Sequence, residues 1–362
     1  MIRAIAVSLL LLAATPALAL EDADYSAAVA ATAKTAIIPG YQAFGESAAE
    51  LQTRLDALCK APGDETLKAA QQQFADTTAA WARIQYISFG PIFEHQRAFR
   101  IEYWPDKRNV VGRQLAEVLK KQDRAALEPE RFATTTVGVQ GLPALERLLY
   151  GDDALSELKS PNAAFRCSLL TAISSNLETI ARDVVTGWTE GASAFLARVE
   201  HPSADDEELP SGRDAAGRLL NDLLTATIAM RDMKLLVPLG SSLEKAKGPS
   251  AEYWRSGQSA AVLAANLEGW RAQFFAKNGL GALLAAQPDG KPTADDLTAA
   301  VDQASSALQR VTLPLDKAVA DPAQRKLVEA FAAQLIKMRD LLAGPVTTKL
   351  NIPVGFNALD GD

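Results

Sequence analysis

The sequence has few histidine, cysteine and aromatic residues, and each scarcity limits what the protein can be. Only two histidines and two cysteines occur among 362 residues. A zinc or di-iron centre built from several imidazoles is therefore excluded. Aromatic residues make up 6% of the chain, and β-branched residues are comparatively scarce, which argues against an all-β fold.

Basic residues are also outnumbered, by 44 Asp and Glu to 37 Lys and Arg, for a net charge of −7. Without a long basic run, the chain is not expected to use nucleic acid as its main partner. Hydrophobic residues reach 48%, enough for a substantial core. Ala (67) and Leu (47) supply nearly a third of the chain, and because both favour helices, the composition predicts an all-α fold.

Residues 1–19 have the pattern of a secretory signal peptide. Arg3 supplies the positive start, residues 4–14 are apolar, and Ala17-Leu18-Ala19 fits a cleavage site. The apolar run is shorter than the ~20 residues of a membrane span, and no later segment approaches one. We therefore expect a soluble, exported protein in the periplasm or associated with an outer membrane.

Export changes how the two cysteines are interpreted. Cys59 and Cys167 form an even pair in an oxidising compartment, which predicts a structural disulfide closing a loop of ~100 residues. Two buried thiols remain the alternative. Neither cysteine has a nearby histidine to activate it, so a catalytic thiol is not expected.

Long helices are predicted from apolar residues at helical spacing. The segments are 65–87, 162–189, 213–235, 251–276, 294–313 and 322–343, the last ending at Gly344-Pro345. The acidic, Pro-bearing stretch 201–212 is predicted to link an N-terminal bundle (20–200) to a C-terminal bundle (213–345). In the tail, 346–362, the apolar residues Ile352, Val354, Phe356 and Leu359 imply that it packs back on the body.

Charges and aromatic residues in segment 81–106 make the first candidate site. Arg97 and Arg100 are three residues apart, so a helical turn points them the same way, and two guanidinium groups suit a carboxylate or phosphate. The alternative is a buried ion-pair network in which Glu94 or Glu102 neutralises them.

Glu146 marks the second candidate segment, 137–151, because it lies within a stripe of leucines. Such a carboxylate needs a partner or a shifted pKa, so Glu146 is either a ligand or metal contact or one half of a salt bridge with an arginine. Trp104, Gln140 and Arg231 are weaker candidates, and a solvated or paired charge is the alternative for Arg231.

The two histidines are weak candidates. His95 lies next to Glu94 and near Arg97, so it is considered as a ligand or pH-sensitive contact. His201 lies in the acidic stretch and is expected to be exposed.

The segment Gly141-Leu142-Pro143-Ala144-Leu145-Glu146, followed by Leu148-Leu149-Tyr150-Gly151, resembles the G-x-H-x-x-E signature of the imelysin family. Similar stretches are Phe89-Gly90-Pro91, Arg97 to Arg100 leading to Tyr103-Trp104-Pro105-Asp106, Leu235 to Gly240, and the closing Gly355 to Asp362. The chain is most similar to the branch that includes insulin-cleaving outer-membrane imelysins.

The resemblance implies two packed up-and-down helix bundles related by duplication, with a pocket between them near the signature. It also implies a bacterial periplasmic or outer-membrane protein associated with iron acquisition. The family was first described as metallopeptidases, with the signature His and Glu proposed as metal ligands. Here Pro143 occupies the histidine position, and proline cannot coordinate a metal.

Three functional hypotheses follow. The first is a non-catalytic protein that binds a small anionic ligand or an iron complex between its bundles. Its site would be lined by Glu146, Arg97 and Arg100, with Trp104, Gln140 and Arg231 as weaker members. The second is a metallopeptidase with bound zinc or iron, and the third is a non-enzymatic partner of an outer-membrane receptor.

Overall fold

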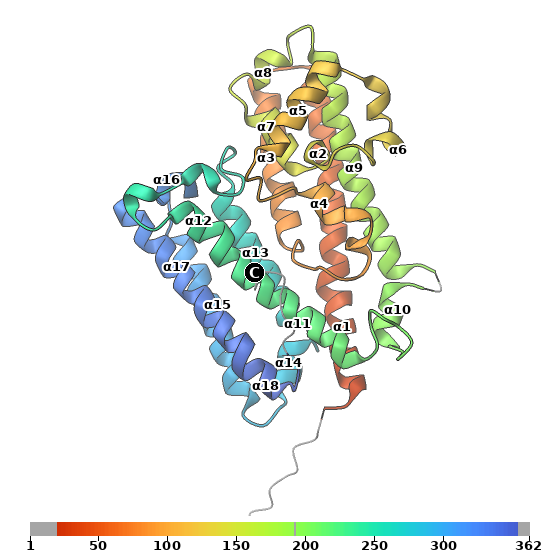
Figure 1. Ribbon diagram of the computed structural model, residues 1–362, viewed down its shortest axis with the longest axis vertical. Coiled ribbons are helices and arrows are strands. Elements are labelled where there is room, and N and C mark those ends of the chain that lie inside the picture. The colour runs from red at the N-terminus through yellow and green to blue at the C-terminus, as the bar shows by residue number, and fades with distance from the viewer. Residues whose placement is uncertain (1–19, 192, 354–362) are drawn as a thin grey trace, which may run out of the picture.

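The computed structural model describes residues 20–191 and 193–353, and all regular secondary structure in these ranges is helical. The all-α prediction is confirmed. The long helices form an N-terminal and a C-terminal group, which lie side by side (Figure 1). Within the described residues, no helix is both long and apolar enough to cross a membrane. The predicted signal peptide, 1–19, lies outside the described residues, as do Val354, Phe356 and Leu359 of the tail.

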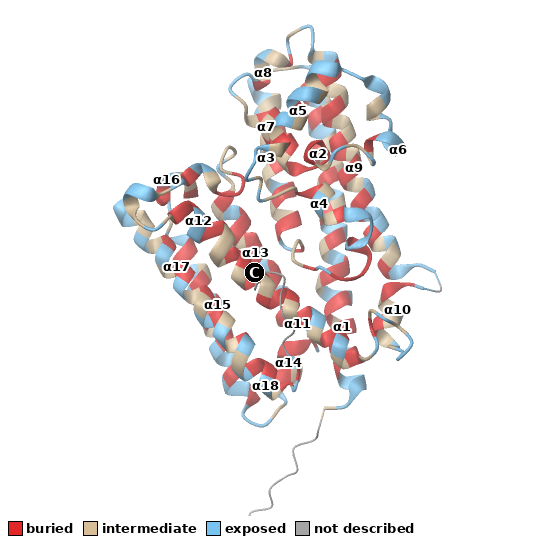
Figure 2. Ribbon diagram, viewed as in Figure 1, coloured by how far each residue is buried: buried red, intermediate tan, exposed pale blue. Residues whose placement is uncertain are grey.

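The N-terminal group is built on three long helices. Helix α1 (Asp22–Thr32) continues through a π-helical turn (Ala33–Ile37) into α2 (Ile38–Lys60), which packs against α3 (Asp64–Ala82) and α9 (Ala163–Thr189). Apolar side chains every three or four residues face the shared core, as the buried stripes in Figure 2 show. Shorter helices pack around the upper half of this group in Figure 1, with α4 the lowest of them: α4 (Arg97–Ile101), α5 (Val110–Lys121), α6 (Pro129–Phe132), α7 (Leu142–Tyr150) and α8 (Ala154–Glu157).

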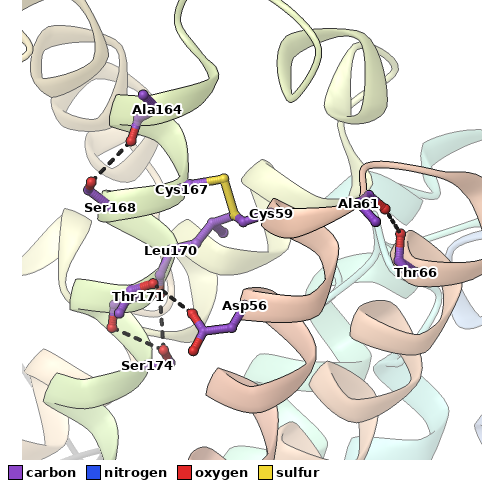
Figure 3. The surroundings of a disulfide bond; sticks show 10 residues. All are labelled: Asp56, Cys59, Ala61, Thr66, Ala164, Cys167, Ser168, Leu170, Thr171 and Ser174. Atoms are coloured by element: carbon purple, nitrogen blue, oxygen red, sulfur yellow. Dashed lines mark hydrogen bonds between the residues drawn. A yellow bond between two sulfur atoms is a disulfide. The ribbon is translucent and has the colours of Figure 1, made fainter.

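A disulfide ties α2 to α9, which confirms the predicted pairing. Cys59 near the end of α2 and Cys167 near the start of α9 are joined with an S–S distance of 2.03 Å and a Cα–Cα distance of 5.8 Å (Figure 3). About one turn further along, the Thr171 hydroxyl donates to Asp56 Oδ1 at 3.3 Å. The two helices are therefore fixed side by side at this end.

The C-terminal group packs α15 along α17, with α13 and α11 beside them. The helices are α11 (Gly212–Ala229), continued by a π-helical turn (Met230–Leu235) into α12 (Leu236–Leu239), then α13 (Ser259–Phe274), α14 (Leu280–Ala285), α15 (Gly290–Gln309), α16 (Leu315–Ala318) and α17 (Pro322–Leu341).

Two predicted helix ends in this group were wrong. The helix predicted from residue 251 begins at Ser259, because left-handed backbone at Tyr253 (φ 50) and Gly257 (φ 70) breaks the helical path. The last helix does not end at Gly344-Pro345. It continues through a π-helical turn (Leu342–Val346) into α18 (Thr347–Lys349), and this wider turn accommodates Pro345, which has no N–H to donate.

The two groups meet where α1 packs on α11 and α3 packs on α13. Side chains of α13 cap the carbonyl groups at the end of α3. Asn266 donates to the Ala82 carbonyl at 2.7 Å, and Gln273 donates to the Arg83 carbonyl at 3.0 Å. A Cβ at Gly269 would overlap the Arg83 backbone, so only glycine permits this close approach.

The acidic stretch 201–212 connects α10 (Phe195–Glu200) to α11, but it is anchored rather than freely solvated. Arg198 forms a two-pronged bond to Asp206, both distances being 2.8 Å, and the Gly90 N–H donates to Glu208 at 3.0 Å. His201 is exposed, as expected.

The described part of the tail packs on the body, with Leu350 and Ile352 both buried. The Tyr25 hydroxyl donates to the Leu350 carbonyl at 2.6 Å. The chain beyond α18 therefore returns to the start of α1.

Candidate functional site at the junction of the bundles

A cavity of about 730 Å³ lies where the two helical groups meet. Its walls are residues 102–109, Val111, Pro143, Glu146 and Arg147 from the first group, and Met233, Val237 and residues 249–255 from the second. Both the signature-like segment and the loop before α13 therefore face the same space. This size is in the range of small-molecule sites.

Helix α7 reaches the cavity because its first residues pack closely against the end of α4. A Cβ at Gly141 would overlap the Ile101 carbonyl oxygen, so the helix can begin here only with glycine. Pro143 is tolerated in the first turn, where its missing N–H has no helical partner to lose. The leucines of α7 are buried in the N-terminal core. The intervening position, Glu146, is directed toward the other helical group.

Glu146 is 4% exposed and is held by residues from across the junction. Its Oε1 accepts from the Ser256 backbone N–H at 3.0 Å and the Ser256 hydroxyl at 2.8 Å. Arg255 lies 4.0 Å from Oε2. Burial raises the pKa of Glu146, while the Ser256 hydrogen bonds and Arg255 act in the opposite direction. The salt-bridge interpretation of Glu146 was therefore partly right, with a partner from the other group.

Arg147 and Arg255 place two guanidinium groups on the same cavity. Arg147 donates to Asn109 Oδ1 at 2.6 Å, and Arg255 lies over the Trp254 ring, 4.5 Å from its centre. Burial and then the nearby charge of Arg255 lower the pKa of Arg147. Within residues 20–191 and 193–353, Arg147 has no ion pair with a carboxylate. Asp106 and Glu146, which line the same cavity, raise the pKa of Arg147 in part, so the two guanidinium groups are only partly compensated.

Behind the cavity lies a buried ion pair between Lys234 and Glu252, with N and O 2.7 Å apart and both side chains 2% exposed. Lys234 also donates to Gln85 at 3.0 Å and to Asn266 at 2.8 Å. Desolvation alone would lower the pKa of Lys234, but Glu252 and the other acidic groups around it raise the pKa overall. The lysine is thus held charged inside the junction, 5.9 Å from the ring centre of Trp104.

Glu102 adds a second buried carboxyl group beside this pair. Its Oε2 accepts from the Trp81 indole at 2.7 Å and the Gln85 amide at 3.0 Å, while Oε1 has no hydrogen-bond partner in the described part of the chain. Burial and then the charge of Glu252 raise the pKa of Glu102 to about 8. Glu102 therefore takes up a proton more readily than an exposed glutamate, and its protonation reduces repulsion between the two carboxyl groups.

The residues predicted to form one site do not all lie together in the structure. Trp104 shares the junction cavity with Glu146. Arg97 instead donates to the Pro91 carbonyl at 2.5 Å and pairs with Glu94 at 3.0 Å. This is the ion-pair alternative for Arg97, with Glu94 rather than Glu102 as the partner.

Three other predicted residues lie away from the junction cavity. Arg100 lines a different, larger cavity on the N-terminal group, and it donates to the buried Gln140 at 2.8 Å. Arg231 pairs with its neighbour Asp232. The physical reason lies in the short α4. Its Arg100 bonds Asn176 of α9 and its Arg97 bonds Pro91 and Glu94, and the chain reaches the junction cavity only after Ile101.

The described residues contain no group of three or more His, Cys, Asp or Glu side chains that could hold a metal ion. His95, considered as a ligand, is exposed and has a left-handed backbone (φ 53). Glu146, the other metal candidate, directs one oxygen to Ser256.

Sequence reasoning missed Arg147, Lys234, Glu252, Arg255 and Ser256 as members of the site. The only available signal was a lysine inside a Leu-rich helix end. Nothing local identifies its partners.

Comparison with known proteins gives a consistent result. The chain matches the family model Peptidase_M75, described as Imelysin, over residues 37–342. An imelysin-like protein from Psychrobacter arcticum 273-4 has a similar structure, with 26% identity and a TM-score of 0.76, covering 94% of this chain and 100% of that one. A putative iron-regulated protein A precursor from Parabacteroides distasonis ATCC 8503 also has a TM-score of 0.76, with 15% identity and coverage of 92% and 97%. No curated protein matches the sequence.

Proposed function

This chain belongs to the imelysin family, and we propose that it binds a small anionic ligand in the cavity between its two helical bundles. The observation that carries this proposal is the pair of guanidinium groups of Arg147 and Arg255 on one wall. They are close enough for Arg255 to lower the pKa of Arg147, although Asp106 and Glu146 act in the opposite direction. The one ion pair at these two arginines within the described residues joins Arg255 to Glu146 at 4.0 Å. An anion placed between them removes this repulsion.

The chemistry of the wall supports a carboxylate-bearing ligand. Guanidinium groups form paired hydrogen bonds with carboxylates, and such charge-assisted bonds are stronger when water is partly excluded. Trp104 and Trp254 offer apolar surface beside the charges. Binding by charge pairing, without bond breaking, accounts for a signature position occupied by Pro143, which supplies no metal ligand.

Glu146 acts as a positioning residue in this proposal. Its carboxylate accepts both hydrogen bonds of Ser256 and lies near Arg255, so it fixes the loop that carries Arg255 against α7. Loss of Glu146 is therefore expected to weaken ligand binding by releasing the loop across the junction.

Iron uptake outside the cytoplasm is the proposed setting. The predicted signal peptide, 1–19, supports export to the periplasm or to an outer-membrane location. The similar structure from Parabacteroides distasonis is named as an iron-regulated protein, which supports ferric complexes as ligands to test. A carboxylate-rich ferric chelate fits the charge of the cavity wall.

Isothermal titration calorimetry with citrate, ferric citrate and haem tests the proposal. We expect at least one of these ligands to bind, and Arg147→Met and Arg255→Met each to weaken that binding by about tenfold or more, since a charge-assisted bond contributes ~1.5–3 kcal/mol. Arg54→Met removes an exposed arginine paired with Glu50 and is the matched control, expected to bind normally.

Absence of binding by all three ligands, or unchanged affinity in both cavity variants, would refute the proposal. Stoichiometric zinc or iron in the purified protein, with chelator-sensitive peptide cleavage, would support the metallopeptidase hypothesis instead. Specific capture of an outer-membrane receptor, without binding of any of these ligands, would support the docking hypothesis.

A further inference from the structure

A second cavity, of about 910 Å³, lies on the N-terminal bundle and shares no described residue with the junction cavity. It runs along α9 beneath the segment 124–133, and the disulfide Cys59–Cys167 lies in its wall. The covalent link between α2 and α9 therefore fixes part of the framework of this cavity.

Arg100 is one of the basic residues that line this second cavity. Its Nε donates to Gln140 Oε1 at 2.8 Å, and its Nη2 donates to Asn176 Oδ1 at 2.7 Å. Both partners are neutral, buried amides. Within the described ranges, no carboxylate lies within ion-pair distance of this guanidinium group.

The two amides are themselves held in place, so the guanidinium is oriented in advance. Gln140 donates to the Thr135 carbonyl at 2.6 Å, and Asn176 donates to the Gln140 carbonyl at 3.1 Å. These bonds direct both amide oxygens toward Arg100. A guanidinium group has five N–H donors, of which two are used here. The three others belong to Nη1 and Nη2, the end of the group that can donate to both oxygens of one carboxylate.

The rest of the cavity indicates what kind of anion fits. Apolar surface comes from Leu127, Phe132, Ala172 and Ile180. Four carboxylates also line the cavity, namely Asp56, Glu128, Glu178 and Asp183, against the three basic residues Lys60, Arg100 and Arg124. Acidic groups repel ligands that carry two or more negative charges, so a singly charged head with an apolar body is favoured over phosphate or a dicarboxylate.

We propose that this second cavity is a binding site for an apolar monocarboxylate of the medium-chain fatty-acid type, with its carboxylate on the free end of Arg100. The apolar chain lies between α9 and the segment 124–133. This site is independent of the junction cavity and of the anion bound there.

The test uses octanoate as the probe, measured by isothermal titration calorimetry on the mature, disulfide-bonded protein. We expect one octanoate per chain, and binding of octanamide, its neutral counterpart, weaker by about tenfold or more. Inorganic phosphate is expected not to bind at this site. Arg100→Met is expected to weaken octanoate binding by about tenfold or more, with little effect on octanamide.

Two further variants keep the outcome interpretable. Ala172→Trp fills the cavity and keeps Arg100 and its two amide partners in the chain, so it should abolish octanoate binding even where Arg100→Met fails to fold. Arg255→Met lies in the other cavity and should leave octanoate affinity unchanged, which separates this site from the proposed function. No octanoate binding, or equal affinity in wild type and Ala172→Trp, overturns the inference, as does phosphate binding in place of octanoate.

Discussion

Removal of the disulfide between α2 and α9 is expected to lower the free energy of unfolding substantially. Cys59 and Cys167 are 108 residues apart in sequence, so the bond restricts a long loop in the unfolded chain. In the chain-entropy model a loop of this length corresponds to roughly 16 cal/mol/K, or about 5 kcal/mol at 25 °C. Native domains are stable by only ~5–15 kcal/mol, so this loss is a large fraction of the total.

The folded state is expected to survive the double substitution Cys59→Ser and Cys167→Ser. Both cysteines are only partly buried, and α2 and α9 pack against one another along their length. Loss of the disulfide is therefore expected to act mainly by raising the entropy of the unfolded chain. The far-ultraviolet circular dichroism of the folded variant should match that of the wild type.

Urea unfolding of the wild type, the double serine variant and the wild type in dithiothreitol provides the measurement. The double serine variant and the reduced wild type should have the same free energy of unfolding, several kcal/mol below that of the oxidised wild type. Thr171→Val, which removes the hydrogen bond to Asp56 one turn away, is the control, with an expected loss of ~1 kcal/mol. A double variant within about 1 kcal/mol of the oxidised protein would refute the loop-entropy reasoning.

Two further predictions concern the junction. The pKa of Glu102 is about 8 in the folded protein against 4.5 as the ordinary value, so the native state holds this proton more strongly than the unfolded chain does. The stability that this proton contributes is fully present below about pH 4.5 and is lost as the pH rises toward 8. Glu102→Gln should therefore make the melting temperature less dependent on pH between pH 5 and 8. An unchanged slope of melting temperature against pH would contradict this prediction. Gly141→Ala should destabilise the protein by ~2 kcal/mol or more, because its Cβ would overlap the Ile101 carbonyl. In chemical unfolding, Gly217→Ala, whose Cβ would lie 3.6 Å from Ile352, should be neutral or stabilising by up to ~1 kcal/mol, and equal losses in both variants would count against the steric argument.

Most of the long helices could be predicted because each buries an apolar stripe whose spacing is visible in its own local sequence. Helix α2 (Ile38–Lys60) was not among the predicted segments. Helix α9 was predicted at 162–189 and spans Ala163–Thr189. Helix ends were less predictable. Pro345 normally ends a helix, yet the π-helical turn Leu342–Val346 accommodates it.

The site was only partly predictable. Glu146 could be recognised as a buried carboxylate because it interrupts a leucine stripe, and Trp104 could be included as a neighbour of charged residues. Arg97 and Arg100 could be recognised as sharing one face of α4, but the direction of that face depends on how α4 packs against α9. Sequence spacing contains no information on that packing.

By itself, the sequence indicated the helical class, the approximate positions of six long helices and the pairing of its two cysteines. These features depend on composition, periodicity and the number of cysteines. Only the tertiary structure decided which charges meet. Glu146 is bound by Ser256, 110 residues away, and Lys234 is paired with Glu252 from a separate loop. Such contacts arise when two bundles pack, and packing joins residues whose local sequences are unrelated.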